Sequence, residues 1–515
     1  MSLHVATSTL RGRLIAPYQH EGVRWMLSRE TATGVKGGIL SDEMGLGKTV
    51  QVIATILGNP GQKTLIIVPK SIVNQWKQEI EHFAPSLTVH AFDGPRRALV
   101  PSSVTIAPYS VLIEKNSRLH QEVWGRIVLD EGHQIRNTRS KIFKSCCDLT
   151  SPIRWILSGT PVYNSIRDFV ALCAFIGISQ SAVQGFSTQI RDTYVLRRTK
   201  EEGNGGSALN NSRLQLPPCD FQNIELDMFP EELELYTRVF TSSRDRVRQI
   251  MARADAGQMF MNILECFLRV RQVLIHPQLY LNGVARQGGY EPDRWTHRTH
   301  KMTTLFEMIL EHPREKTLVF CQFTEEINFI QKRLEDMGQL VFRIDGSVEQ
   351  ETRILMIAEF KKAASGVFVI QVKSGGQGLN LQEATRVYIT SPSWNPATEL
   401  QAIGRSHRTG QTQKVTVRKL VYKGSPDLPS IEESIMELQR HKAVITAQVL
   451  NDPRLATQIP VGSNSMTTKD LKRIFEIDDG PRGTKRKVGP TQEEGAPRLT
   501  QEGASRRPFV ELEDP

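Results

Sequence analysis

Short apolar runs alternate with segments of helical spacing along this chain, and that alternation restricts the fold more than any other feature. Stretches such as KTVQVIATIL and SIVNQWKQEIEHF space their apolar residues as amphipathic helices do. Between such stretches, the first 200 residues hold five runs of buried-strand length: GGILS (37–41), TLIIVP (64–69), SVTIAPYS (103–110), GRIVLDE (125–131) and RWILSGT (154–160). Strands that alternate with helices predict βαβ units, and hence an α/β fold on a largely parallel sheet with both faces covered.

A second block of the same kind follows farther along the chain. Its strand-like runs are KTLVFCQF (316–323), LVFRIDG (340–346), GVFVIQV (366–372) and TRVYITS (385–391). We therefore predict two α/β lobes, over residues 1–200 and 296–455. Residues 201–295 show a loop and charged helices without strand alternation, which predicts a helical insertion or brace. Residues 456–515 are rich in Gly, Pro, Gln, Glu and Arg, a composition typical of a disordered tail.

The composition predicts an intracellular protein with a polyanionic partner. No apolar run approaches the roughly 20 residues that span a membrane, and the first residues lack the apolar core of a secretory signal. The six cysteines include no C-x-x-C pair, which predicts reduced, mostly buried thiols and no dedicated zinc site. The formal net charge of +10 favours a nucleic acid through counterion release, although an ordinary solvated surface would give the same charge.

The stretch SDEMGLGKTV lies between a predicted strand and a predicted helix, the position of a phosphate-binding loop. Gly45 and Gly47 would let backbone N–H groups close around phosphate oxygens at a helix N-terminus. Lys48 would reach the outer phosphates, and the Thr49 hydroxyl would bind Mg²⁺. One position departs from the full pattern, because Asp42 stands where its first glycine is expected. The alternative is a glycine turn with a surface lysine.

The stretch VLDEGH, at 128–133, ends a predicted apolar strand with two carboxylates. Carboxylates in such a place are costly unless they serve a cation. Asp130 fits as a magnesium partner, and Glu131 as the residue that positions or deprotonates water. A solvated Asp–Glu pair at a strand end would give the same letters, but the preceding phosphate loop favours the catalytic interpretation.

Four motifs occur in a fixed order: GLGKT, DEGH, SGTP (158–161) and QAIGRSHR (401–408). Together they resemble the ordered motifs of superfamily-two helicases. A narrower similarity, to the Swi/Snf-type DNA translocases, rests on DEMGLGKT, GGQGLNL (375–381), SWNP (393–396) and HRTGQ (407–411). The resemblance runs from about Leu14 to Val421. DEGHQIRN and LRRTK (196–200) resemble the repair branch that often carries a RING zinc insertion, which is missing here.

The resemblance implies two RecA-like lobes with ATP between them, and double-stranded DNA bound across both lobes. It implies a nucleotide site made of Gln19, Asp42, Glu43, Met44, Gly45, Leu46, Gly47, Lys48, Thr49, Gly378 and Gln401, in which Gln19 reads adenine. Thr49 and Asp130 would hold Mg²⁺. The implied catalytic residues are Lys48, Asp130, Glu131, Arg405 and Arg408.

Segments of both lobes also resemble family segments that contact the DNA backbone. The DNA-binding candidates are Pro69, Lys70, Pro108, Tyr109, Ser110, Lys373, Gly376, Asn380 and Trp394. Trp76 matches too, but an aromatic residue on a helix is more often part of the core. Ser158 and Thr160 match the segment that couples nucleotide state to DNA contact.

The stretch WNPATELQAIGRSHRTGQ predicts a helix over 396–408, since Asn395 suits the N-cap and Pro396 the first helical position. Arg405 and Arg408 would then share one helix face. Paired guanidiniums suit the oxygens of a transferring phosphoryl group, so these arginines would complete the site of the first lobe when the lobes close. An exposed basic helix face is the alternative.

These observations predict a Mg²⁺-dependent ATPase, stimulated by double-stranded DNA, that translocates as a monomeric motor and remodels chromatin or displaces bound proteins. A strand-separating DNA or RNA helicase is the alternative enzyme, and a catalytically idle DNA-binding scaffold is the third hypothesis. TKRKVGP (484–490) resembles a basic nuclear import signal. A solvated charge cluster would look the same, and so would a virus-encoded motor acting on host or viral DNA.

Overall fold

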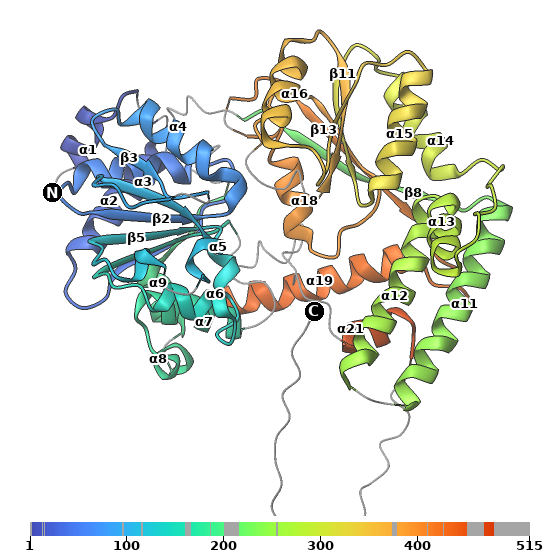
Figure 1. The fold of residues 1–515 in the computed structure, drawn as a ribbon, viewed down its shortest axis with the longest axis horizontal. Coiled ribbons are helices and arrows are strands. Elements are labelled where there is room, and N and C mark those ends of the chain that lie inside the picture. The colour runs from blue at the N-terminus through green and yellow to red at the C-terminus, as the bar shows by residue number, and fades with distance from the viewer. Residues whose placement is uncertain are drawn as a thin grey trace, which may run out of the picture. The chain divides into compact units, whose positions relative to one another are not determined.

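The structure is a computed structural model that gives two α/β lobes with parallel sheets (Figure 1). This confirms the predicted fold class. Among the residues that the structure describes, no helix is both long and apolar enough to cross a membrane. The described residues are 3–12, 14, 16–94, 97–114, 117–159, 166–185, 187–199, 216–253, 256–372, 379–408, 410–425, 427–450 and 468–477.

The sheet of the first lobe has seven strands in the order β3-β4-β2-β5-β6-β1-β7, and all its strand pairs are parallel. Its strands are β1 (Lys36–Leu40), β2 (Thr64–Val68), β3 (Val89–Ala91), β4 (Val104–Pro108), β5 (Arg126–Asp130), β6 (Ile153–Leu157) and β7 (Val195–Leu196). Five of them are the runs predicted from the sequence. β3 and β7 were missed because they have only three and two residues.

Helices cover both faces of this sheet. The helices and 3-10 turns are α1 (Leu3–Thr9), α2 (Pro17–Thr31), α3 (Lys48–Gly58), η1 (Lys70–Ile72), α4 (Val73–Phe83), α5 (Tyr109–Leu112), η2 (Arg118–His120), η3 (Gly132–Ile135), α6 (Lys141–Cys147), α7 (Ile166–Ile176), α8 (Gln180–Gly185) and α9 (Ser187–Tyr194). Successive residues of β2 enter two different hydrophobic clusters, Leu65 and Ile67 on one face, Ile66 and Val68 on the other. A strand with both faces buried reads as one continuous apolar run, which is why the sequence revealed it.

The second sheet has six strands in the order β10-β11-β9-β12-β13-β8, again all parallel. They are β8 (Cys219–Leu226), β9 (Lys316–Cys321), β10 (Val341–Ile344), β11 (Gly366–Gln371), β12 (Arg386–Ile389) and β13 (Val415–Tyr422). The helices that follow in this part of the chain are α14 (His300–Leu310), α15 (Thr324–Asp336), α16 (Gln350–Lys362), α18 (Pro396–Ile403) and α19 (Ile431–Leu450).

The segment predicted as a helical insertion contributes a strand to this second sheet. β8 pairs with β13 along its whole length, from Cys219 opposite Val415 to Leu226 opposite Tyr422. The expectation that residues 201–295 hold no strand was therefore wrong. β8 lies at the sheet edge and only Leu226 is fully buried, so its sequence lacks the apolar alternation that marks a strand.

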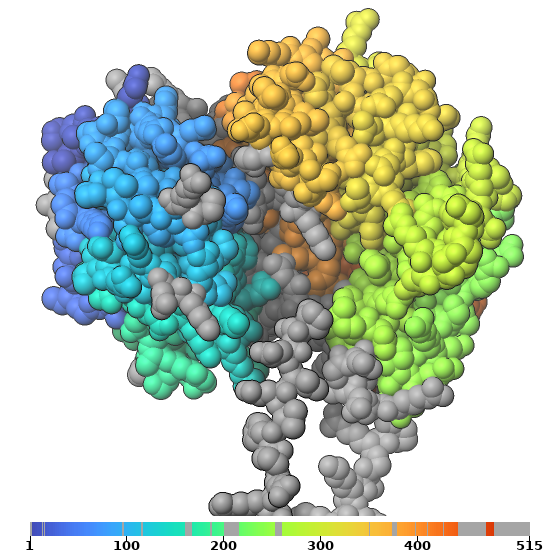
Figure 2. Space-filling view, viewed as in Figure 1, coloured from blue at the N-terminus to red at the C-terminus, as the bar shows by residue number. Residues whose placement is uncertain are grey.

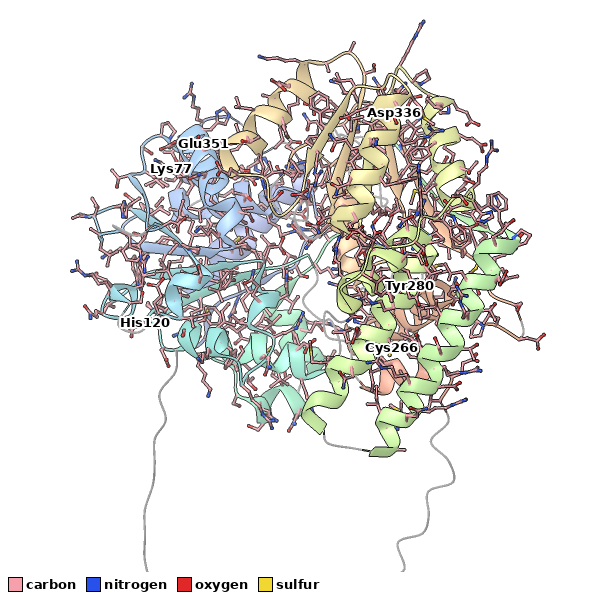
Figure 3. The ribbon with its side chains drawn as sticks, turned by 45° about the vertical axis from the view of Figure 1, so that its right-hand side comes forward. Lys77, His120, Cys266, Tyr280, Asp336 and Glu351 are labelled. Carbon is pink, nitrogen blue, oxygen red and sulfur yellow. The ribbon has the colours of Figure 1, made fainter. Side chains whose placement is uncertain are left out.

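Most of the rest of that described segment is helical, as predicted, and its helices share a hydrophobic core with the second sheet. Its helices are α11 (Pro230–Arg253), α12 (Ala256–Ile275) and α13 (Pro277–Gly288). Cys266 of α12 is buried with Tyr388 of β12 and Leu420 of β13, and Tyr280 of α13 packs at the margin of the same cluster (Figure 3). In Figure 2 the green surface of these helices continues into the yellow surface of the second lobe.

Part of the predicted disordered tail is ordered. Residues 468–474 form α21 (Thr468–Ile474), which packs against α12 and α19. Leu471, Ile474 and Phe475 are fully buried, so the expectation of disorder was wrong for this short segment. Residues 456–467 and 478–515 lie outside the described part of the chain, and the predicted domain boundaries stay a prediction.

Candidate functional site

The predicted phosphate loop connects β1 to α3, at the carboxyl edge of the first sheet. Gly45 and Gly47 have φ values of 90° and 75°, in the left-handed region that favours glycine. A Cβ atom on Gly47 would also lie 2.6 Å from Nε2 of Gln19. The loop therefore needs glycine at this position on two grounds, and it leads directly into the N-terminus of α3.

Lys48 is the first residue of α3, and its ammonium group lies over the loop. Nζ donates a hydrogen bond to the carbonyl oxygen of Asp42 at 2.7 Å. Burial lowers the pKa of Lys48, while the negative charges of Glu131, Asp42 and Asp130 oppose this change. The loop and the two carboxylates predicted from VLDEGH are thus brought together around one lysine.

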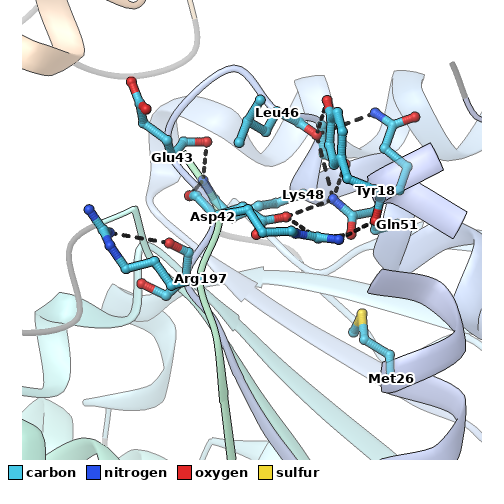
Figure 4. A network of polar contacts seen from close by, with 12 residues as sticks. Tyr18, Met26, Asp42, Glu43, Leu46, Lys48, Gln51 and Arg197 are labelled. Atoms are coloured by element: carbon cyan, nitrogen blue, oxygen red, sulfur yellow. Dashed lines mark hydrogen bonds and ion pairs between the residues drawn. The ribbon is translucent and has the colours of Figure 1, made fainter. Parts of the chain in front are cut away.

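Asp42 is bound by Arg198, which explains why this position departs from the glycine pattern. Its carboxylate is fully buried. Nε of Arg198 donates to Oδ1 at 2.9 Å, and Nε2 of Gln51 donates to Oδ2 at 3.1 Å. The N–H group of Glu43 donates to the carbonyl oxygen of Arg198 at 2.9 Å, so the segment after β7 lies beside the start of the loop (Figure 4). The motif LRRTK indicates the family but does not by itself predict a role for this arginine.

Tyr18 and Gln19, at the start of α2, contact the outer side of the loop. The Tyr18 hydroxyl and Nε2 of Gln19 both donate to the carbonyl oxygen of Leu46, at 3.2 and 3.3 Å. Burial, helped by the charge of Asp42, raises the pKa of Tyr18 to about 12. Gln19 is 1% exposed. Its position beside the loop is consistent with nucleotide recognition, and its contact with adenine stays a prediction.

Asp130 ends β5, and each of its carboxylate oxygens accepts a hydrogen bond. Oδ1 accepts from the N–H group of Glu131 at 2.8 Å, and Oδ2 accepts from Nε1 of Trp76 at 2.7 Å. Burial, together with the charge of Glu131, raises the pKa of Asp130 to about 6. The remaining lone pairs of this carboxylate are the kind of hard oxygen ligand that Mg²⁺ prefers.

Glu131 has an unusual backbone conformation. Its φ of 49° places it in the left-handed region, where only one other described non-glycine residue, Glu476, is found. Its Oε2 lies 3.3 Å from Nδ1 of His133. Burial opposes ionisation of Glu131, but His133, Lys48 and Arg405 together outweigh burial and lower its pKa. Left-handed non-glycine residues are costly and cluster at functional sites.

The predicted DNA-contact residues of the first lobe divide into exposed and buried ones. Lys70 and Ser110 are exposed, and the two prolines that precede them in their segments are buried. Trp76 and Tyr109 are 2% and 3% exposed. The Tyr109 hydroxyl donates to the carbonyl oxygen of Asp130 at 2.8 Å. These two aromatic side chains therefore face Asp130 and not the surface.

The predicted helix of the arginine motif is shorter than expected. α18 begins at Pro396, as predicted, but ends at Ile403, and Gly404 follows it. Glycine is a poor helix former, which accounts for the stop. Arg405 and Arg408 lie in the turns beyond, so the prediction that they share a helix face was wrong.

The turn gives the two arginines different electrostatic partners. Burial lowers the pKa of Arg405 to about 10, and the charge of Glu131 acts against this change. Burial also lowers the pKa of Arg408, and there the opposing charge is that of Glu79. Arg405 is 7% exposed, and its Nη1 donates to the carbonyl oxygen of Leu379 at 3.4 Å. Of the two arginines, Arg405 is thus the one whose pKa is affected by the charge of a predicted catalytic carboxylate, that of Glu131.

Glu399 of α18 binds the start of the SWNP segment, a role that its sequence context does not predict. Its carboxylate accepts from the N–H group of Ser393 at 2.6 Å and pairs with Nζ of Lys419 at 3.0 Å. Trp394 and Asn380, both predicted to contact DNA, are half-buried, as is Gln401. Thr160, Lys373, Gly376 and Gly378 lie outside the described residues.

Comparison with family models decides what this site belongs to. The model described as SNF2-related domain matches residues 18–279, and the helicase conserved C-terminal domain matches residues 300–410. The chain belongs to the SNF2-related family. The first match holds the phosphate loop, both carboxylates and Arg198, and the second holds Arg405 and Arg408. The predicted resemblance is confirmed, and with it the enzyme class of the family, DNA-dependent ATPases of helicase-like architecture.

Several relatives resemble this SNF2-related chain over most of its length. The probable global transactivator of Orgyia pseudotsugata multicapsid polyhedrosis virus is 26% identical, over 89% of this chain and 94% of the viral protein. The DNA repair protein RAD5B of Arabidopsis thaliana is 26% identical, over 86% of this chain and 47% of the relative. The human SWI/SNF-related matrix-associated actin-dependent regulator of chromatin subfamily A member 1 is 28% identical, over 92% of this chain and 46% of the human protein. The chain thus spans nearly all of the viral relative and about half of the other two.

Solved structures of the family are similar as well. The Sulfolobus solfataricus SWI2/SNF2 ATPase core in complex with dsDNA is 26% identical, covers 91% of this chain and 98% of its own, and has a TM-score of 0.39.

Proposed function

We propose that this SNF2-related chain is a Mg²⁺-dependent ATPase that is stimulated by double-stranded DNA and moves along it, remodelling chromatin or displacing DNA-bound proteins. The observation that carries the proposal is the convergence on Lys48. Its partly buried ammonium group lies at the phosphate loop, and the charges of Glu131 and Asp130 act on it from the end of β5. This is the set of groups that phosphoryl transfer requires of the protein.

The described residues fit a nucleoside triphosphate. Gly45 and Gly47 have left-handed backbone conformations directly before the N-terminus of α3, where the helix dipole favours anions. The partly buried Lys48 ammonium donates to carbonyl oxygens of the loop, at 2.7 Å from Asp42 and 3.4 Å from Glu43, and a phosphate would add a charged partner. Tyr18 and Gln19 brace the loop at Leu46.

The same residues fit a magnesium ion. Thr49 follows Lys48 at the start of α3, and Asp130, whose charge acts on Lys48, ends β5 of the same parallel sheet. A hydroxyl and a carboxylate are oxygen ligands of the kind that Mg²⁺ takes together with phosphate oxygens and water. An ion held by Thr49 and Asp130 would supply positive charge against the negative charge that develops on the phosphates.

Each residue then has a distinct task. Lys48 holds the outer phosphates, and Glu131, kept ionised by His133, Lys48 and Arg405, orients the attacking water and accepts its proton. Arg405 supplies positive charge to the transferring phosphoryl group. The charge of Glu79 acts on Arg408, which favours a smaller part for Arg408 than for Arg405 in contact with the phosphoryl group.

The DNA path in the first lobe would run over Lys70 and Ser110. Both are exposed, and they follow β2 and β4, two neighbouring strands of one parallel sheet. Asn380, Trp394, Lys373 and Gly376 are the candidates in the second lobe. The net charge of +10 supports a polyanionic partner. Relatives that include a chromatin regulator and a viral transactivator support action on nuclear or viral DNA. We propose that the chain acts there as a monomeric motor.

The test is the rate of ATP hydrolysis with double-stranded DNA, single-stranded DNA, RNA and nucleosomes, each at two salt concentrations. We expect double-stranded DNA to stimulate most, and the concentration required for stimulation to rise with salt. A higher rate with nucleosomes than with bare DNA would select chromatin remodelling over general protein displacement. Preference for RNA, or strand separation in an unwinding assay, would contradict the proposal and favour a helicase.

A further inference from the structure

Asp130 is held by two aromatic side chains, and each comes from a segment that also carries an exposed DNA-contact candidate. Trp76 binds its carboxylate and Tyr109 binds its carbonyl oxygen. The strands concerned are neighbours in the sheet, in the order β4-β2-β5. Three segments that leave the same edge of the sheet therefore meet at one residue.

The first connection starts at Lys70. This exposed residue begins η1, which runs without a break into α4, where Trp76 lies. The indole N–H group is the only donor of a tryptophan side chain. Trp76 is buried, so losing its acceptor would leave an unsatisfied donor, which is costly. A shift of α4 and a turn of the Asp130 carboxylate are consequently coupled.

The second connection starts at Ser110. This exposed residue follows Tyr109, whose buried hydroxyl donates to the Asp130 carbonyl at 2.8 Å. That carbonyl belongs to the peptide group that leads into Glu131. Because Glu131 has a φ of 49°, its conformation is strained and persists only where neighbouring groups hold the backbone in place. Tyr109 is one of those groups.

We propose that Trp76 and Tyr109 are positioning residues that transmit DNA contact on the first lobe to the ATP site. Trp76 orients the Asp130 carboxylate toward the metal, and Tyr109 fixes the peptide that aims Glu131 at the water. DNA phosphates that bind Lys70 and Ser110 hold both segments, and so stabilise the hydrolysing arrangement of the two carboxylates. This inference rests on the proposed function, and it adds a physical route by which DNA accelerates hydrolysis.

The experiment uses two variants of the full chain, Trp76→Phe and Tyr109→Phe, each of which removes one donor and leaves an aromatic ring, smaller than the indole in the case of Trp76. The chain offers a matched control for each. Trp155→Phe removes a fully buried indole donor that binds Glu30 at 2.9 Å, in the same lobe. Tyr388→Phe removes a buried hydroxyl that donates to the carbonyl oxygen of Met308 at 3.0 Å, in the second lobe.

The readouts are kcat and KM for ATP, without DNA and with saturating double-stranded DNA, the melting temperature, and DNA affinity. In the two site variants we expect the stimulation of kcat by DNA to fall about tenfold, with KM for ATP and DNA affinity changed less than about twofold. The controls should lose thermal stability and keep their stimulation ratio. If Trp76 and Tyr109 had only a structural role, their loss would lower stability without selectively lowering the stimulation of kcat by DNA.

Metal binding provides a readout that does not depend on turnover. Mn²⁺ serves as a paramagnetic substitute for Mg²⁺, and its affinity for the chain with a non-hydrolysable ATP analogue is measured by EPR. Loss of an outer hydrogen bond to a metal ligand weakens metal binding about 10–100-fold, so Trp76→Phe should bind Mn²⁺ at least about tenfold more weakly than Trp155→Phe.

The outcomes separate this inference from the proposed function. A wild-type chain whose ATPase does not respond to DNA overturns both. A wild-type chain that responds, with site variants that keep the same stimulation ratio and the same Mn²⁺ affinity, overturns the positioning role alone. Equal loss of stimulation in the controls would also overturn it, since any buried donor would then serve.

Discussion

Asp42 and Arg198 lie 156 positions apart in the chain and form a buried ion pair, with Nε of Arg198 donating to Oδ1 of Asp42 at 2.9 Å. Arg198 also donates to Oε1 of Gln51 at 2.8 Å, and its guanidinium lies over the ring of Tyr18. The pair ties the start of the phosphate loop to the segment that leaves the first lobe. The residue that breaks the glycine pattern of the loop is thus the one that anchors this segment.

A double-mutant cycle with Asp42→Asn and Arg198→Met should show strong coupling. Each single change leaves the other group without its buried partner, at a cost of about 3–5 kcal/mol in the free energy of unfolding. The double variant should lose less than the sum, because neither uncompensated charge remains. Urea unfolding measures both terms. The matched cycle on Lys63 and Glu122, whose side chains are 35% and 39% exposed, should give a coupling of about 1 kcal/mol or less. Equal coupling in the two cycles would contradict the assignment.

Arg405 and Arg408 should differ in their effect on hydrolysis. Arg405→Lys keeps the charge and loses the planar fork, so kcat with DNA should fall by at least about 100-fold while KM for ATP changes little. Arg408→Lys should have a smaller effect, since its charge partner is Glu79. Arg248→Lys, at a position that is 50% exposed, is the control. Steady-state ATPase assays decide, and a larger loss in Arg408→Lys than in Arg405→Lys would reverse the assignment.

His276 makes stability depend on pH. It caps α13 by accepting from the N–H group of Gln278 at 3.1 Å, and burial lowers its pKa to about 4. An unfolded histidine has a pKa of about 6.5. As pH falls below that value, the unfolded chain therefore binds a proton at this residue and the folded chain does not. The free energy of unfolding should therefore drop by about 2 kcal/mol between about pH 7 and about pH 5 from this residue alone.

The His276→Asn variant isolates this contribution. Asparagine is a good N-cap and does not titrate in this range, so the variant should lose about 2 kcal/mol less than the wild-type chain over the same interval. His297→Asn, at a side chain that is 52% exposed, should leave the wild-type dependence unchanged. Parallel pH dependences for wild type and His276→Asn would refute the assignment.

The sequence predicted those parts of the fold whose burial follows a simple period. The central strands β2 and β5 are buried along almost their whole length, and such strands show up as apolar runs. The edge strand β8 is mostly half-exposed, and α21 is a seven-residue helix between segments of polar composition, so neither had a clear pattern. The predicted helix that begins at Pro396 extends too far, because Gly404, a poor helix former, ends the helix before the two arginines.

The candidate site shows the same division. Lys48, Asp130 and Glu131 were predicted because each motif is local: a loop before a helix, or carboxylates at the end of a strand. The partners of these residues are distant in the chain. Trp76 lies 54 positions before Asp130, and Arg198 lies 156 positions after Asp42. Periodicity reports how one element is buried, and it does not report which side chains meet once the sheet order brings their strand ends together.

The most direct test of the central claim is ATP turnover by Lys48→Ala in the presence of saturating double-stranded DNA. Its control is Lys77→Ala, a change on α4 at a side chain that is 43% exposed and is labelled in Figure 3. We predict that the wild-type chain and Lys77→Ala hydrolyse ATP faster with DNA, and that Lys48→Ala loses at least about 100-fold of this rate with its fold intact. Undiminished ATP turnover by a folded Lys48→Ala chain would contradict the account.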